Sequence, residues 1–251
     1  MEIFKKLVRE GKNDELARLS KYQIAWVLYQ MGKDKEAINE FTNYIAEYRQ
    51  SEITPDTVFW LGQYYYEQRE WDAALKYFAE VSQTYPTHPL SAQADYWSAW
   101  AIKEKNDIPL AVEKLKSICA KYPQSVISAE ASYQIGNFLY EIGKSEEGLD
   151  YFNQTILNYP NTDFKRLSYK RTGEILASQD EFQKAGEAFR QALNENRDSL
   201  NAEIQFELAA CVQKIGDIEK ALNEYLKVGY LYPQAKEWVE KAQAEINKLD
   251  K

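Results

Sequence analysis

One small residue recurs along this 251-residue chain at a nearly constant interval, and that interval restricts the folds open to the chain. The successive spacings are 37, 37, 37, 37 and 36 residues. The recurring positions are Ala37, Ala74, Ala111, Gly148, Ala185 and Ala221. A fixed period of this length is typical of stacked supersecondary units, each of which buries its apolar face against its neighbours.

A large apolar residue follows each small one after four positions. These residues are Phe41, Phe78, Leu115, Phe152, Phe189 and Tyr225. Residues four apart lie on the same side of a helix. The small residue therefore allows a neighbouring helix to approach closely, and the large one fills the space beside it.

Helix ends recur with the same period. Proline cannot continue a helix and disfavours helical backbone in the residue before it, so a closing Tyr-Pro pair marks the end of a unit. The pairs are Tyr85-Pro86, Tyr122-Pro123, Tyr159-Pro160 and Tyr232-Pro233. The fifth unit has Asn196-Arg197 instead and must end its helix differently. Glycines at one turn position, as at helix C-caps, separate two helices within a unit; they are Gly32, Gly143 and Gly216.

This pattern of small, aromatic and proline positions resembles the tetratricopeptide motif over about residues 18–233. The resemblance implies an all-α fold, a right-handed superhelical solenoid of six helix pairs, with thirteen or fourteen helices in all. It also implies a protein-binding scaffold rather than an enzyme. The 37-residue period and the closing Tyr-Pro resemble the bacterial envelope type, such as the Tol–Pal-associated coordinator and the lipoprotein of the outer-membrane assembly machine.

The six predicted repeats lie between two end segments. Residues 1–17 are either a capping helix or the remainder of an earlier repeat from a longer protein, because Phe4 aligns with Phe41 one period later. Residues 235–251 are predicted to form a solvating helix with an apolar stripe of Trp238, Ala242 and Ile246. The repeats are predicted at 18–54, 55–91, 92–128, 129–165, 166–201 and 202–234.

The charge balance disfavours two classes of partner. The formal net charge is −8, and there is no run of lysine and arginine, so phosphate backbones and anionic lipids are repelled. We therefore expect no nucleic acid and no direct membrane insertion, since no apolar run approaches the roughly 20 residues that span a bilayer. The two cysteines, Cys119 and Cys211, are interpreted as buried thiols in helices.

The residues needed for catalysis are scarce. The single histidine, His88, falls in a turn between units with no catalytic partner nearby in sequence. Metal-ligand spacings and phosphate-binding glycine loops do not occur. We therefore expect no catalytic residues, no metal and no cofactor.

The first helix of each pair provides the candidate binding surface. In proteins of the tetratricopeptide type it lines a concave groove, which the second, fifth, ninth and twelfth positions of each repeat face. In the first four repeats these positions are rich in aromatic and amide side chains. The predicted groove residues are Tyr22, Trp26, Tyr29, Phe59, Gln63, Tyr66, Tyr96, Trp100, Tyr133, Asn137 and Tyr140.

Such a band suits an extended peptide or an amphipathic helix, and in that case Trp26, Tyr66, Trp100 and Tyr140 should be substantially exposed. Packing between repeats, or an internally filled channel, is the alternative. The sequence thus predicts a scaffold for a protein or peptide segment, with a possible role in bacterial envelope assembly and a periplasmic location. Self-assembly through the groove, or a glycan- or peptidoglycan-associated enzyme subunit of the envelope, are the other functions considered.

Overall fold

The computed structural model describes residues 1–10 and 14–249, and every regular element within them is a helix. Fourteen helices occur in this part of the chain, which confirms the all-α prediction. The chain divides into two compact units, Met1–Lys114 and Leu115–Lys251, whose boundary falls inside α7. Residues 11–13 of the predicted end segment 1–17 lie outside the described residues.

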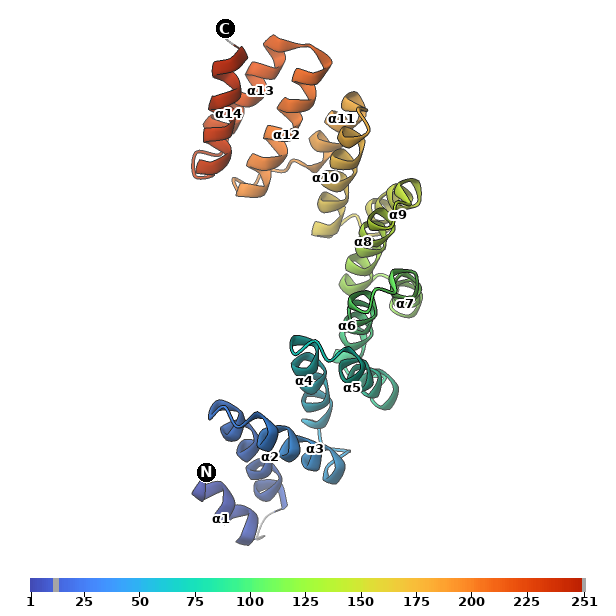
Figure 1. The fold of residues 1–251 in the computed structure, drawn as a ribbon, viewed down its shortest axis with the longest axis vertical. Helices are drawn as coiled ribbons and strands as arrows, with labels where there is room; N and C mark the ends of the chain where they lie inside the picture. Colours follow the sequence, from blue (N-terminus) through green and yellow to red (C-terminus); the bar gives the residue numbers. More distant parts are fainter. Residues whose placement is uncertain (11–13, 250–251) are drawn as a thin grey trace. The chain divides into compact units, whose positions relative to one another are not determined.

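The first unit is built from helices that pack successively against one another (Figure 1). The first helices of neighbouring pairs, α4 and α6, also touch directly. The helices are α1 Glu2–Glu10, α2 Asp14–Gln30, α3 Asp34–Glu47, α4 Thr54–Glu67, α5 Trp71–Thr84, α6 Leu90–Glu104 and the start of α7 Ile108–Lys121.

The second unit repeats the same arrangement after the end of α7. Again each helix packs on the next, and α8 touches α10 as α12 touches α14. The helices are α8 Val126–Glu141, α9 Ser145–Asn158, α10 Asp163–Ser178, α11 Phe182–Ala192, α12 Ser199–Ile215, α13 Ile218–Leu231 and α14 Lys236–Leu249.

The predicted pairs of small and large residues form the centre of the packing. Ala74 and Phe78 of α5 are both fully buried, and Phe78 lies directly over Gly62 of α4. A Cβ atom at Gly62 would stand only 2.6 Å from the Phe78 ring. Helices α4 and α5 therefore approach closely enough that the position of Gly62 has no room for a methyl group.

The turn inside each pair requires a left-handed residue at one fixed position. The predicted glycines there have positive φ, for example +71° at Gly32. Three pairs place a different residue at the same point, with φ of 60° to 63°: Arg69, Asn106 and Asp180. The backbone conformation is thus imposed by the packing of the two helices, and glycine only makes it easier to adopt.

The fifth predicted repeat ends its second helix through a buried polar network in place of proline. Helix α11 stops at Ala192, and the fully buried Asn201 of α12 binds the connection that follows. Its Nδ2 donates to the Asn194 carbonyl and side-chain oxygens at 3.2 and 2.6 Å. Its Oδ1 accepts from Arg166 at 2.6 Å, and Arg166 also donates to the Ala192 carbonyl at 3.0 Å. These hydrogen bonds satisfy backbone carbonyl groups at and after the end of α11, where other units have a closing Tyr-Pro pair.

The C-terminal helix α14 covers the last pair as predicted. Ala242 and Ile246 are buried, and Trp238 packs with Phe206 of α12 at 5.4 Å between ring centroids. The charged side chains of α14 remain exposed, for example Lys241 and Glu240. No helix of residues 1–10 and 14–249 combines the length and apolarity of a membrane span.

Candidate binding surface

The predicted band in the first unit comes from α2, α4 and α6, but its aromatic side chains are less exposed than the groove prediction requires. Phe59 and Tyr96 are buried, each with 7% of its surface exposed. Trp26, Tyr66 and Trp100 are partly buried. The expectation of substantial exposure is therefore wrong for these anchors. It is also wrong for Tyr140 of α8, which is partly buried within the second unit.

The burial arises because aromatic side chains of successive repeats interlock. Trp60 of α4 packs edge to face against Trp26 and Tyr29 of α2, with both pairs of ring centroids 4.9 Å apart. It also contacts Phe41 of α3 at 4.7 Å. Trp60 was not among the predicted groove residues, because it occupies the sixth position of its repeat. At this position a side chain points toward the preceding pair, so the alternative of packing between repeats applies to Trp26 and Tyr29.

One repeat later, a similar contact involves a smaller set of rings. Tyr66 at the end of α4 packs against Trp71 of α5 at 5.0 Å and against Trp97 of α6 at 5.1 Å, both edge to face. All three side chains keep part of their surface exposed. Burial and the nearby carboxylate of Glu104 raise the pKa of the Tyr66 phenol. Gln63, one turn earlier, is partly exposed, and its side chain makes no hydrogen bond within the described residues.

In the second unit one predicted residue has aromatic neighbours and two contact a cation. Tyr133 packs on Phe152 and Phe164, at 5.6 and 5.9 Å. Asn137 accepts a hydrogen bond of 3.2 Å from Arg171 of α10, whose guanidinium lies 5.0 Å from the centre of the Tyr140 ring. The aromatic and amide side chains here bind a cation of the same chain.

An ion-pair network continues from Arg171 along α10 and α12. Arg171 bonds Glu174 at 2.7 Å, while Lys170 pairs with Glu174 and, at 3.0 Å, with Glu203. Burial would raise the pKa of Glu174, but its bonds to Lys170 and Arg171 outweigh this effect and lower it. Burial, together with Glu174 and Glu203, raises the pKa of Glu207. The face of the second unit is therefore charged but internally neutralised.

The groups that could support catalysis are scattered. His88 lies 3.7 Å from Asp56 through Nε2, and its Nδ1 accepts from the Leu90 N–H at 3.3 Å. Both cysteines are free thiols. Burial and Glu207 raise the pKa of the Cys211 thiol to about 11, so it is a poor nucleophile at neutral pH. No group of histidine, cysteine and carboxylate side chains in the described part of the chain could hold a metal ion.

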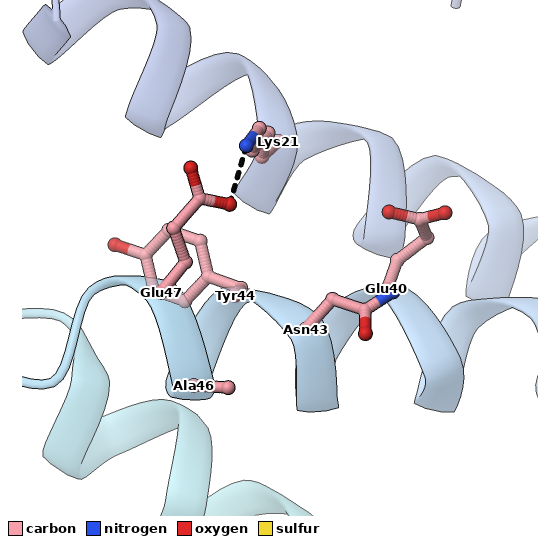
Figure 2. Close-up of a pocket in the computed structure, with 6 residues that line it drawn as sticks. All are labelled: Lys21, Glu40, Asn43, Tyr44, Ala46 and Glu47. Carbon is pink, nitrogen blue, oxygen red and sulfur yellow. Dashed lines mark hydrogen bonds and ion pairs between the residues drawn. The ribbon is translucent and has the colours of Figure 1, made fainter.

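A surface pocket of about 510 Å³ lies apart from the predicted band. Figure 2 shows Lys21 of α2 and Glu47 of α3 joined by an ion pair at this pocket, near the Tyr44 ring. None of its lining residues belongs to the predicted groove: Lys21, Glu40, Asn43, Tyr44, Ala46 and Glu47. The pocket is a depression whose lysine is paired with Glu47.

Known proteins share this architecture. A family model described as a tetratricopeptide repeat-like domain matches residues 61–213, and a tetratricopeptide repeat model matches residues 22–89. No curated protein matches the chain.

Several solved structures have the same fold. The C-terminal part of a TPR repeat-containing protein from Cytophaga hutchinsonii is 18% identical, with a TM-score of 0.66, over 92% of this chain and 89% of that one. PilF from Pseudomonas aeruginosa is 16% identical, with a TM-score of 0.54, over 92% and 98% of the two chains. A MamA protein is 17% identical, with a TM-score of 0.55, over 74% and 96%.

These structures share the fold, and the family models cover more than half of the chain. Tetratricopeptide repeats mediate protein–protein interactions and are typically non-catalytic, so the match supports a scaffold that binds other proteins. The chain belongs to the tetratricopeptide repeat-like family.

Proposed function

We propose that this chain is a non-catalytic scaffold that binds a peptide or helical segment on the first-helix face of its first unit. The observation that carries the proposal is the set of partly exposed aromatic side chains on α4 and α6, above all Tyr66 and Trp97. Gln63 lies beside them with an amide that has no hydrogen-bond partner within the described residues. The comparable positions of the second unit are already bound by Arg171 and its carboxylate partners.

The chemistry of this face supports a peptide ligand. Tyrosine and tryptophan offer large contact area with little loss of side-chain freedom, which is why they dominate binding energies at protein interfaces. An unpaired amide can bond a peptide backbone group. We place the ligand on α4 and α6, because there the amide of Gln63 lies beside the partly exposed rings.

Selection from a random peptide library on the immobilised chain tests the proposal. The selected peptides should bind the Gln63→Ala and Tyr66→Leu variants at least about tenfold more weakly than the unmodified chain, as expected for central interface positions. Tyr230→Ala is the matched control, because Tyr230 is 83% exposed on α13, outside the band. Peptides that bind all three variants with unchanged affinity would show that the partner binds elsewhere.

A second candidate is self-association, favoured by an exposed apolar patch on α13. Leu226 and Tyr230 lie four residues apart on one side of this helix and are 54% and 83% exposed. Light scattering coupled to chromatography should then show a dimer that Tyr230→Ser dissociates. A monomer at high concentration would remove this candidate.

We further propose that the scaffold acts in the bacterial envelope, on the periplasmic side. The 37-residue period and the closing Tyr-Pro pairs support this location. Fractionation of cells that express the parent gene, with detection by antibody, tests it. Recovery with cytoplasmic markers would contradict it.

A further inference from the structure

Three aromatic rings meet where the end of α4, the start of α5 and the middle of α6 come together, and Glu104 is the last residue of α6. Tyr66 contacts Trp71 and Trp97, with ring centroids 5.0 and 5.1 Å apart and interplanar angles of 63° and 71°. The carboxylate of Glu104, near the end of α6, is close enough to raise the pKa of the Tyr66 phenol, in addition to the effect of burial. We call these four residues the aromatic cluster.

The rings of the aromatic cluster can accept a further contact on their faces. In an edge-to-face pair, the ring that offers its edge keeps its own faces free of that partner, and a ring face is electron-rich. All three rings are partly exposed, and Glu104 is exposed. Such a combination of ring faces and a carboxylate attracts an organic cation.

The lysine and arginine side chains that the structure describes do not cover these rings. Lys105, next to Glu104, pairs with Asp72, next to Trp71, at 2.5 Å. Within the described residues, no lysine or arginine lies over the ring of Tyr66, Trp71 or Trp97, and Glu104 has no ion-pair partner. The aromatic cluster thus keeps one unpaired negative charge beside uncovered aromatic surface.

The second unit shows what an equivalent position binds. Three residues of the second unit lie 74 residues, or two periods of 37, after residues of the first: Tyr140 after Tyr66, Asn137 after Gln63 and Arg171 after Trp97. There the Arg171 guanidinium lies 5.0 Å from the centre of the Tyr140 ring and donates to Asn137 at 3.2 Å. The tyrosine and amide positions can therefore contact a guanidinium, which the second unit supplies from the position that Trp97 occupies in the first.

We propose that the aromatic cluster of Tyr66, Trp71, Trp97 and Glu104 binds an arginine side chain of the partner peptide, with Gln63 as an additional hydrogen-bond partner. This inference rests on the proposed function, because it assigns a chemistry to the same face. The guanidinium would contact the ring faces, while Glu104 supplies the opposite charge. The acidic balance of the chain, with a net charge of −8, also favours a cationic partner.

Two peptides that differ in a single charge test the inference. One is acetyl-Ala-Ala-Arg-Ala-Ala-amide, and the other carries citrulline, which keeps the shape of arginine but is uncharged. The indole N–H resonances of the six tryptophans are followed by NMR during titration, with Trp71→Phe and Trp97→Phe variants for assignment. The arginine peptide should shift the Trp71 and Trp97 signals in a saturable way, and the citrulline peptide should bind at least about threefold more weakly.

Two variants locate the charge. Glu104→Gln should weaken binding of the arginine peptide by about threefold or more, and Glu52→Gln should leave it unchanged. Both side chains are exposed, so neither change should affect folding. Equal binding of the two peptides, absence of any shift, or equal weakening by the two variants would overturn the inference. So would tetramethylammonium binding as tightly as the arginine peptide, since the site would then prefer a small cation.

The outcomes separate this inference from the proposed function. If library-selected peptides require Gln63 and Tyr66 but tolerate citrulline in place of arginine, the proposed peptide-binding face is supported and the proposed cation site is refuted. If the selected peptides ignore both residues while the arginine peptide still shifts Trp71 and Trp97, the cation site stands without the proposed peptide-binding face.

Discussion

Replacing Gly173 of α10 by alanine should destabilise the second unit, although alanine favours helices. A Cβ atom built at Gly173 would lie 2.8, 2.9 and 2.9 Å from three atoms of the Phe189 ring. Ordinary contacts begin near 3.4 Å, so the ring or the helix would have to move by about half an ångström or more. Phe189 is fully buried, so its ring can move only by displacing the side chains packed around it.

The magnitude follows from two opposing terms. Overpacking a filled core costs about 1–3 kcal/mol. Exchange of glycine for alanine inside a helix contributes about 1 kcal/mol in the opposite direction. The free energy of unfolding should therefore fall by roughly 0–2 kcal/mol, with damage spreading to the neighbouring repeats.

Gly186→Ala is the matched control, because it makes the same change in the helix that pairs with α10. A Cβ atom at Gly186 would meet Leu208 at 3.5 Å and Cys211 at 3.9 Å, which are normal contacts. With room available, this variant should be stabilised by about 0.5–1 kcal/mol. Urea unfolding followed by circular dichroism should rank Gly186→Ala above the unmodified chain and Gly173→Ala below it. Equal stabilisation by both changes would refute the close packing of Phe189 on α10.

Three further predictions concern packing, polar contacts and charge. Trp26→Ala should lower the free energy of unfolding by about 3 kcal/mol, measured in thermal melts, since Trp26 packs on Trp60 at 4.9 Å; a loss near 0.5 kcal/mol would instead indicate a free groove residue. Asn201→Ala should lower the free energy of unfolding by about 2–3 kcal/mol and increase amide hydrogen exchange around residues 193–198, because it leaves buried hydrogen-bond partners unbonded. Unchanged exchange would contradict the hydrogen-bond network of Asn201. Glu207→Gln should stabilise the chain at pH 7 by up to about 1 kcal/mol. The pKa of Glu207 is raised in the folded chain, so the stability that this group contributes is present below its unfolded pKa of about 4.3 and is lost as the pH rises through its folded pKa. The stability advantage of the glutamine variant should therefore vanish near pH 4 in thermal melts. An equal advantage at pH 4 and pH 7 would refute this prediction.

Helices and their pairing could be predicted because they depend on local spacing. The small residue Ala74 and the large residue Phe78 form a pattern that repeats with the period, and both are fully buried. The Tyr-Pro pairs also mark helix ends, as α5 ends just before Tyr85. These features depend on residues within one unit, so the sequence contains all the necessary information.

The binding surface could be predicted only in part, because it depends on contacts between units. Trp26 and Tyr66 were both predicted to face the groove, yet each packs on a tryptophan of the next pair along the chain, Trp26 on Trp60 and Tyr66 on Trp97. The contribution of Trp71 to the aromatic cluster was missed, since it is the first residue of the second helix and follows no groove period. Asn201 was likewise unpredicted, because a buried asparagine that replaces a proline stop has no periodic signal.

The left-handed turn residue has a consequence for how the chain tolerates insertions and deletions. In every pair this residue stands five positions before the recurring small residue, as Arg69 does before Ala74 and Gly216 before Ala221. The one 36-residue step instead falls after the small residue Ala185, where α11 has 11 residues and α9, one pair earlier, has 14. One residue added inside a pair would rotate the second helix by about 100° and turn its small residue away from its neighbour. Natural variation in length should therefore accumulate after the small residue of each pair and be almost absent between the turn residue and the small residue.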